Sequence, residues 1–390
     1  MASINQFFYI TKQVVFVTVF VFFSTLNAKN FDKFSQAGSI SDYFSGVLHL
    51  SENEYELSYQ YLKKLDGLET NHNSYSTKYL YSLVNSGNLD KAFNFSKKIE
   101  NKGLSSFESD LISGIYFLKN NNLSDANKYF LKAKRRKVDS VLSNYIIESL
   151  LIWSNIQNFN LNDKDFIMNK LDNRFGNLKK IQNVFLNCFF ESNQTEILFE
   201  KLINDQTDFS RYNFFYAQYL DSVGKRGKAK KIIEASLVEN PRNLILNQLK
   251  YDFDNSKKNL SFDCKKQKHI SAELLYITAN ALSSQSVYPL SNFYLNLSKY
   301  LNENFHTFDT LFAQNFYSIG DYSNAKKIYK RFTKYGNIFK WHADKQIARI
   351  LILENEKQKS FKLLANSFKN LKYKTVYEIF DYAEFLKNNE

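Results

Sequence analysis

Residues 114–133 read GIYFLKNNNLSDANKYFLKA, and this stretch decides the fold. A segment that begins with Gly114 runs into three consecutive asparagines, which are typical of a tight turn. Beyond the turn, Ala126, Phe130 and Ala133 recur at spacings of four and three, so they share one face of a second helix. The stretch therefore predicts a helical hairpin. In it Gly114 lets a neighbouring helix approach closely, and Phe130 fills the gap between successive hairpins.

The same spacing recurs along the chain. Gly46, Leu80 and Gly114 lie 34 residues apart, and a step of twelve residues from Ala217 or Ala313 reaches another alanine. A 34-residue recurrence of helix, turn and helix predicts a stacked solenoid, in which each unit buries its apolar face against its neighbours. We expect the following residues to be buried where helices pack: Gly46, Ala92, Gly114, Ala126, Phe130, Ala133, Ala217, Ala229, Ala313 and Ala325.

Three short segments run from a glycine at a turn to an alanine and occupy the same position in the repeat: Gly87 to Ala92, Gly224 to Ala229 and Gly320 to Ala325. With Glu239-Asn-Pro241 as a stop between repeats, they resemble the tetratricopeptide repeat (TPR) family. The resemblance covers nearly everything after residue 38. It implies an all-α protein, a right-handed α-solenoid of TPR-like helix-turn-helix repeats.

The phase divides the chain into segments. We expect N-terminal TPR-like repeats over 38–240 and C-terminal repeats over 271–390, which end in the single helix Val376 to Lys387. Residues 241–270 depart from the pattern and are predicted to form a degenerate repeat or a loop. The low content of Pro, 2 residues in 390, agrees with an all-helical chain.

The N-terminus is a separate element. Lys12 precedes Val14 to Phe23, a run that is apolar except for Thr18, and small and polar residues follow up to Ala28. This order is typical of an export signal, and the run is too short to span a bilayer by itself. We therefore predict a signal peptide over 1–28, with an uncleaved inner-membrane anchor as the alternative. The mature protein is expected in the periplasm or cell envelope.

The chain carries a net charge of +13. Its lysine clusters fall on second helices or turns, where a solvated outer face explains them, and abundant Asn, Lys, Phe, Tyr and Ile indicate biased codon use. An exported protein also encounters little nucleic acid. We therefore predict no nucleic-acid partner, and we keep open a contact with anionic membrane or an acidic envelope polymer.

Motifs of catalysis and cofactor binding are absent from the sequence. The five histidines form no HExxH or CxxC-type pattern, and Gly224 to Lys231 lacks the spacing of a phosphate-binding loop. We therefore predict no enzyme activity, no metal site and no cofactor. Cys188 and Cys264 are the only cysteines. We expect Cys188 to fill the core as a free thiol, with a single disulfide as the alternative.

The predicted function is protein binding. In the TPR family the first helix of each unit lines a concave groove, and the resemblance maps that face to Tyr81, Arg211, Phe214, Gln218, Asp221, Gln314 and Tyr317. An exposed Phe214 beside polar groups suits a peptide partner. We predict a non-catalytic interaction scaffold of the cell envelope. The alternatives are a subunit or assembly factor of an envelope export or outer-membrane machine, and a carbohydrate-handling enzyme built on a helical solenoid.

Overall fold

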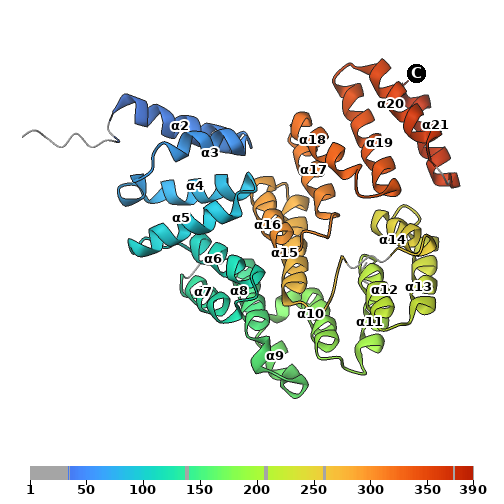
Figure 1. The fold of residues 1–390 in the computed structure, drawn as a ribbon, viewed down its shortest axis with the longest axis horizontal. Coiled ribbons are helices and arrows are strands. Elements are labelled where there is room, and N and C mark those ends of the chain that lie inside the picture. Colours follow the sequence, from blue (N-terminus) through green and yellow to red (C-terminus); the bar gives the residue numbers. More distant parts are fainter. Residues whose placement is uncertain are drawn as a thin grey trace, which may run out of the picture. The chain divides into compact units, whose positions relative to one another are not determined.

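The computed structural model describes residues 34, 36–136, 140–205, 210–257, 261–371 and 374–389. The predicted signal peptide lies outside these residues. Those described are helical, and no strand occurs among them (Figure 1). No helix in the described ranges is both long enough and apolar enough to cross a membrane. The chain divides into two compact units, residues 1–82 and residues 83–390.

The first unit contains one helical hairpin and the start of the next. Helix α2 (Ala37–Ser51) pairs with α3 (Tyr55–Lys63), and most of α4 (Asn73–Asn85) follows. A Cβ placed on Gly46 would lie 2.7 Å from side-chain atoms of Leu62, so only glycine permits this approach of α3. Ser58 donates a hydrogen bond of 2.8 Å to the carbonyl oxygen of Gly46. The hairpin is therefore closed at Gly46.

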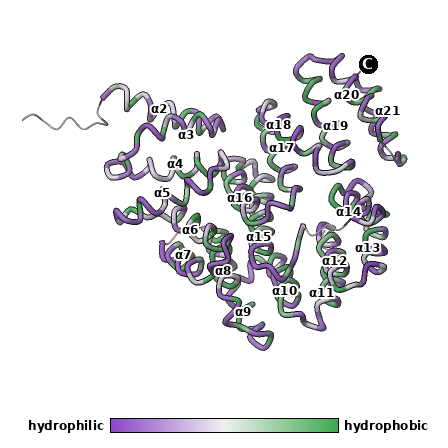
Figure 2. The backbone as a smooth tube through the Cα atoms, viewed as in Figure 1, coloured by the Kyte–Doolittle hydropathy of each residue, from purple (hydrophilic) through white to green (hydrophobic). Residues whose placement is uncertain are grey.

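The second unit continues the hairpins. Its helices are α5 (Leu89–Asn101), α6 (Phe107–Lys119), α7 (Leu123–Arg135), α8 (Val141–Ser154), α9 (Lys164–Asn169), α10 (Gly176–Phe189), α11 (Thr195–Ile203), α12 (Tyr212–Ser222), α13 (Arg226–Glu239), α14 (Leu244–Asp254), α15 (Gln267–Ser284), α16 (Tyr288–Leu301), α17 (Phe308–Ser318), α18 (Tyr322–Phe332), α19 (Asn337–Leu353), α20 (Lys357–Lys369) and α21 (Val376–Asn389). Along the helices, hydrophobic and hydrophilic residues alternate, as expected for elements with one buried face (Figure 2).

Three positions of the repeat are set by backbone geometry. The first, the packing position, is a small residue on the first helix of most hairpins, such as Gly114 or Ala217. The second, the turn position, lies seven residues later and has a positive φ of 58–81° in these regular hairpins: Asn53, Gly87, Asn121, Gly224, Ser286, Gly320 and Asn355. Glycine and asparagine tolerate this left-handed conformation best, which is why they recur there.

The third position, the facing position, lies twelve residues after the packing position and begins the contact of the second helix. It is alanine or serine, and where it is serine its hydroxyl donates to the carbonyl of the packing residue. Ser291 donates to Ala279 at 2.7 Å and Ser360 to Ala348 at 2.6 Å, as Ser58 does to Gly46. All ten residues expected at helix contacts, from Gly46 to Ala325, are buried.

The α6/α7 hairpin shows how local sequence makes this geometry. Ser106 caps α6 through a hydrogen bond from the backbone N–H of Ser109, and Asn122 caps α7 by accepting from the N–H of Asp125 at 3.2 Å. Between them Asn121 takes the left-handed turn. A Cβ on Gly114 would lie 2.3 Å from the ring of Phe130, so the two helices touch there.

The second unit also folds back on itself. Helix α14 packs against α12, α13 and α19, and residues 261–266 form a crossover into α15. Helices α15 and α16 then pack against α6, and α15 also packs against α8 (Figure 1). Helix α14 and the crossover occupy the segment 241–270, for which a degenerate repeat or loop was expected.

Candidate functional site

The residues predicted to line a concave groove lie mainly on α12, and the chain itself covers that face. Arg211, at the start of α12, makes two 2.8 Å hydrogen bonds to the two carboxylate oxygens of Glu273 on α15. Its guanidinium carbon also lies 3.9 Å from the ring centroid of Tyr276. Burial opposes the charge of Arg211, but the attraction of Glu273 outweighs it, and the pKa of Arg211 rises above its usual value. Arg211 therefore joins two helices of this chain.

The predicted exposure of Phe214 is wrong, and Gln218 does not line an open groove. Phe214 is 2% exposed and Gln218 is 4% exposed. The ring of Phe214 stacks on Phe305 with centroids 5.5 Å apart, and Phe215 and Phe262 join the same aromatic cluster. The prediction failed because it assumed an open groove, whereas the crossover and α15 return to fill it.

Other pairs join α5 and α6 to α16 and the residues that follow it. Lys119 of α6 forms a 2.6 Å ion pair with Glu303, and the Tyr300 hydroxyl of α16 donates to Asp90 at 3.0 Å. These contacts join residues more than 180 positions apart in sequence. The inner face of the early helices is thus occupied by α15 and α16.

The remaining predicted residues have different surroundings. Asp221 forms a 3.1 Å ion pair with Arg226, and Tyr81 is half-buried. Gln314 and Tyr317 are exposed one turn apart on α17, where the Tyr317 ring lies 5.6 Å from that of Tyr322. Gln314 and Tyr317 therefore stay available for the predicted role.

The repeat is broken at α8 as well as in the segment 241–270. The packing position, 34 residues after Gly114, holds Glu148, which cannot admit a close second helix. The turn position holds Asn155 with φ −112°, so the left-handed turn is missing. Instead of one second helix, short pieces follow: Ile156–Asn158, Leu161–Asp163 and α9. Helix α9 packs on α10, so α8 lacks the cover that closes the other hairpins.

The missing cover leaves a groove along α8. It consists of two adjacent hollows of about 380 Å³ each, which share Glu148 and Lys170 in their walls. We call it the α8 groove and define it by residues of α7, of α8 and of the segment after α9: Asn127, Leu131, Lys134, Asn144, Glu148, Leu151, Asn169, Lys170 and Asp172. Hollows of this size are in the range of binding sites.

The chemistry of the α8 groove is polar and nearly neutral. Glu148 and Lys134 form a 2.5 Å ion pair across it, and Lys170 lies over the rings of Phe159 and Phe166. Asn144 and Asn169 are exposed, and their carboxamides have no hydrogen-bond partner in the part of the chain that the structure describes. A carboxamide donates and accepts at once, as a peptide unit does. The groove thus offers free amide groups beside the apolar surface of Leu131 and Leu151.

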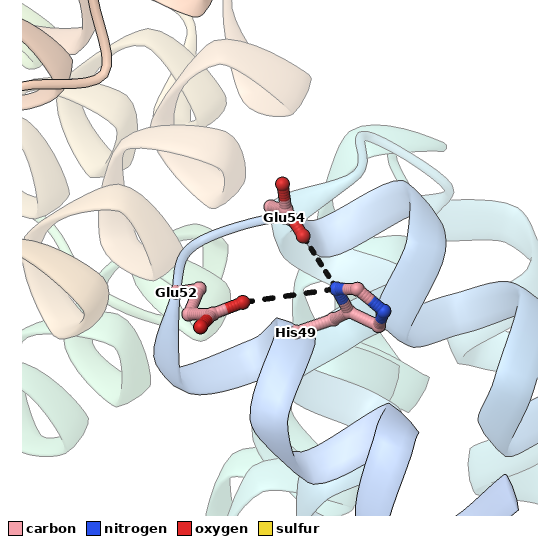
Figure 3. Close-up of side chains that lie close together, drawn as sticks. All are labelled: His49, Glu52 and Glu54. Atoms are coloured by element: carbon pink, nitrogen blue, oxygen red, sulfur yellow. Dashed lines mark hydrogen bonds and ion pairs between the residues drawn. The ribbon is translucent and has the colours of Figure 1, made fainter.

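One cluster within the described ranges could hold a metal ion, although no metal site was predicted. It consists of His49, Glu52 and Glu54, whose ligand atoms lie within 4.8 Å of one another (Figure 3). The Nδ1 atom of His49 already contacts a Glu54 oxygen, and the ring stacks on Tyr61. The two carboxylates are exposed at the end of α2. An ion pair beside a helix C-terminus explains this arrangement without an ion.

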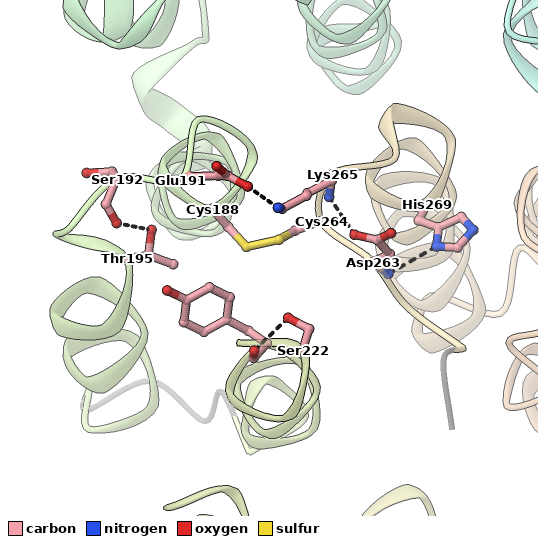
Figure 4. The surroundings of a disulfide bond; sticks show 10 residues. Cys188, Glu191, Ser192, Thr195, Ser222, Asp263, Cys264, Lys265 and His269 are labelled. Carbon is pink, nitrogen blue, oxygen red and sulfur yellow. Dashed lines mark hydrogen bonds and ion pairs between the residues drawn. A yellow bond between two sulfur atoms is a disulfide. The ribbon is translucent and has the colours of Figure 1, made fainter. Parts of the chain in front are cut away.

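The two cysteines form a disulfide, so the expectation of a free thiol at Cys188 is wrong. Cys188 on α10 is joined to Cys264 in the crossover, with Cα atoms 6.0 Å apart (Figure 4). The neighbouring Lys265 forms an ion pair with Glu191, and the backbone N–H of Asp263 donates to His269 Nδ1 at 3.1 Å. A separation of 76 residues hid the pairing, since it depends on the crossover returning to α10.

Comparisons with known proteins add little. No family model matches the chain, and no curated protein matches it. Similar solved structures include yeast Tom70, with 10% identity, a TM-score of 0.26 and 88% of each chain covered. Naa15/Naa10 bound to HypK-THB has 13% identity and a TM-score of 0.22, with 90% of this chain and 66% of that chain covered. The human IFIT1 dimer with m7Gppp-AAAA has 13% identity and a TM-score of 0.24, with 92% and 82% covered. Structural similarity at these TM-scores is too low to support a conclusion. The fold class is therefore assigned from the observed hairpins.

Proposed function

We propose that this chain is an exported, non-catalytic scaffold that binds an extended segment of a partner protein in the α8 groove. The observation that carries the proposal is the break in the repeat at Glu148 and Asn155. It opens a groove beside α8, in an array whose inner face at α12, α15 and α16 is filled.

The chemistry of the groove favours an extended polypeptide. Asn144 and Asn169 have free carboxamides, which pair well with the N–H and C=O groups of a main chain. Leu131, Leu151 and Ile152 offer apolar contacts for side chains of that segment. The charges in the walls are of both signs, so the groove does not demand a highly charged ligand.

Selection of peptides tests the binding proposal. A phage library of random dodecapeptides is selected on the purified chain, and the affinity of enriched peptides is measured by fluorescence anisotropy. The variant Asn144→Trp fills one hollow with an exposed side chain and should weaken binding at least tenfold. Asn193→Trp, an equal change at an exposed turn, should leave it unchanged. Peptides that bind the two variants equally, or a selection without enrichment, would refute the α8 groove as the site.

The disulfide supports the exported location. Such bonds persist in oxidising compartments outside the cytoplasm and are rare inside it. The predicted signal over residues 1–28 agrees with this address. Fusion of residues 1–40 to a reporter that is active only after export should give an active reporter, and a silent one would contradict the location.

A further inference from the structure

The outer face of α21 is apolar and exposed. Val376, Ile379 and Phe380 are 69%, 51% and 56% exposed, and Ala383 is exposed on the same side. The opposite side of α21 is packed, since Phe385 joins Trp341, Ala348 and Leu364 in one hydrophobic cluster. We call Val376, Ile379, Phe380 and Ala383 the α21 face. No helix of the described ranges packs over the α21 face. At its edge, the guanidinium carbon of Arg242 lies 5.8 Å from the centroid of the Phe380 ring.

The register of the repeat shows what the α21 face corresponds to. Residues 35 positions earlier on α19 are Trp341, Asp344 and Ala348, and all three face α20. The Trp341 ring lies 6.0 Å from that of Phe368, Asp344 accepts a 2.7 Å hydrogen bond from Ser367, and the Ala348 carbonyl accepts one from Ser360. Val376, Ile379 and Ala383 therefore occupy the face on which a second helix lies in the preceding hairpin.

The α21 face differs from several of its counterparts at one position. Four residues before the packing position, the first helices α2, α6, α17 and α19 carry aspartate, which pairs with the second helix or its end. Asp42 pairs with Lys64 at 2.9 Å, Asp110 with Arg136 at 2.9 Å and Asp309 with Arg331 at 2.9 Å. In α21 this position is Ile379. A helix on the α21 face therefore needs apolar side chains and no basic group there.

We propose that the α21 face binds an amphipathic helix of a partner protein, which lies where a second helix would lie. The second helices within the chain define the pattern that fits: alanine or serine, followed four residues later by a large apolar residue. Examples are Ala126 and Phe130 on α7, and Ser360 and Leu364 on α20. The small residue allows close approach at Ala383, and the large one covers it. This site is separate from the α8 groove and does not depend on it.

A peptide that copies α20, residues 357–370, is the probe. Labelled with fluorescein, it should bind the full chain saturably in an anisotropy titration. Ile379→Glu should weaken binding at least tenfold, whereas Val238→Glu, the same kind of change at a residue that is 82% exposed on α13, should not. A peptide with aspartate in place of Leu364 should bind at least tenfold more weakly than the original.

Both protein variants change exposed residues, and circular dichroism with thermal melts verifies that they remain folded. Absence of saturable binding by the α20 peptide would overturn the proposal, as would equal binding to the Ile379→Glu and Val238→Glu variants. Sedimentation velocity of the chain alone tests whether a second copy of the chain covers the α21 face. A dimer that Ile379→Glu converts to monomer would mean that a second copy, and not a partner helix, covers the α21 face.

Discussion

The inner face of α12 and the α8 groove belong to the same array, yet only one of them is open. On α12, Arg211 and Phe214 have the polar and aromatic character expected of a binding surface, but α15 and the crossover cover them. On α8, Glu148 and the missing left-handed turn at Asn155 prevent a second helix from closing the hairpin. A helical-repeat surface is thus available only where neither the next helix nor the returning chain covers it.

The largest expected loss of stability concerns Glu273, the buried carboxylate of α15 that pairs with Arg211 on the inner face of α12. Glu273→Gln removes the buried charge that pairs with Arg211 and should lower the free energy of unfolding by about 3–5 kcal/mol. The matched control is Asp221→Asn, which also takes a carboxylate from an arginine but at a partly exposed pair, and it should cost less than about 1 kcal/mol. Urea denaturation of both variants gives the two free energies of unfolding, and equal losses would contradict the structural role of the buried Glu273 carboxylate.

Acid should destabilise the contact between the crossover and His269 of α15. Burial, the main cause, and nearby Lys266 lower the pKa of His269 to about 4. The unfolded chain therefore takes up this proton first, near pH 6.5, and the free energy of unfolding should fall between pH 6.5 and 4 by up to about 3 kcal/mol. Half-buried His342, whose pKa is also lowered to about 4 by desolvation, adds in the same direction.

Denaturation curves at several pH values measure this loss. His269→Asn should flatten the pH dependence in that window, while Asn193→Ala at an exposed turn should leave it unchanged. If the two variants show the same slope, the crossover does not hold His269 in its neutral form.

A closed hairpin should resist a larger side chain. Ala126 is fully buried at the facing position of α6/α7, so Ala126→Leu should overpack the contact and cost about 1–3 kcal/mol. Lys128→Leu on the exposed side of α7 is the control, with an expected change within about 0.5 kcal/mol. An unchanged melting temperature for Ala126→Leu would mean that the repeat phase is wrong.

The smallest effect is expected in the α8 groove. Glu148 occupies the packing position there, but its ion pair with Lys134 is partly exposed, so Glu148→Gln should change the free energy of unfolding by less than about 1 kcal/mol. A loss as large as that of Glu273→Gln would show that Glu148 is a buried structural residue, and that the hairpin is closed.

The hairpins could be predicted from the sequence because their determinants are local. Small residues at Gly114 and Ala126, and a turn at Asn121, act within one repeat and recur at its period. The burial of Phe214 could not be predicted in this way, since it depends on Phe305 and on a crossover more than forty residues away. The same long-range return brings Cys264 to Cys188.

The α8 groove had a local signal that was not used. Glu148 stands at a position where most hairpins carry glycine or alanine, and no glycine follows it at the turn. Here a departure from the repeat, and not its regular pattern, marks the open surface. The aspartates four residues before the packing positions, such as Asp110 and Asp309, were also missed.

Zero-length cross-linking tests most directly whether the returning chain fills the inner face. A carbodiimide joins a lysine to a carboxylate only when the two are in contact, and mass spectrometry of the digested monomer identifies the joined peptides. The structure predicts a link between Lys119 and Glu303, which form a 2.6 Å ion pair across 184 residues of sequence. The link between Lys134 and Glu148 serves as the internal control. If Lys134 and Glu148 are joined but Lys119 and Glu303 are not, α16 does not lie against α6, and the inner face is open after all.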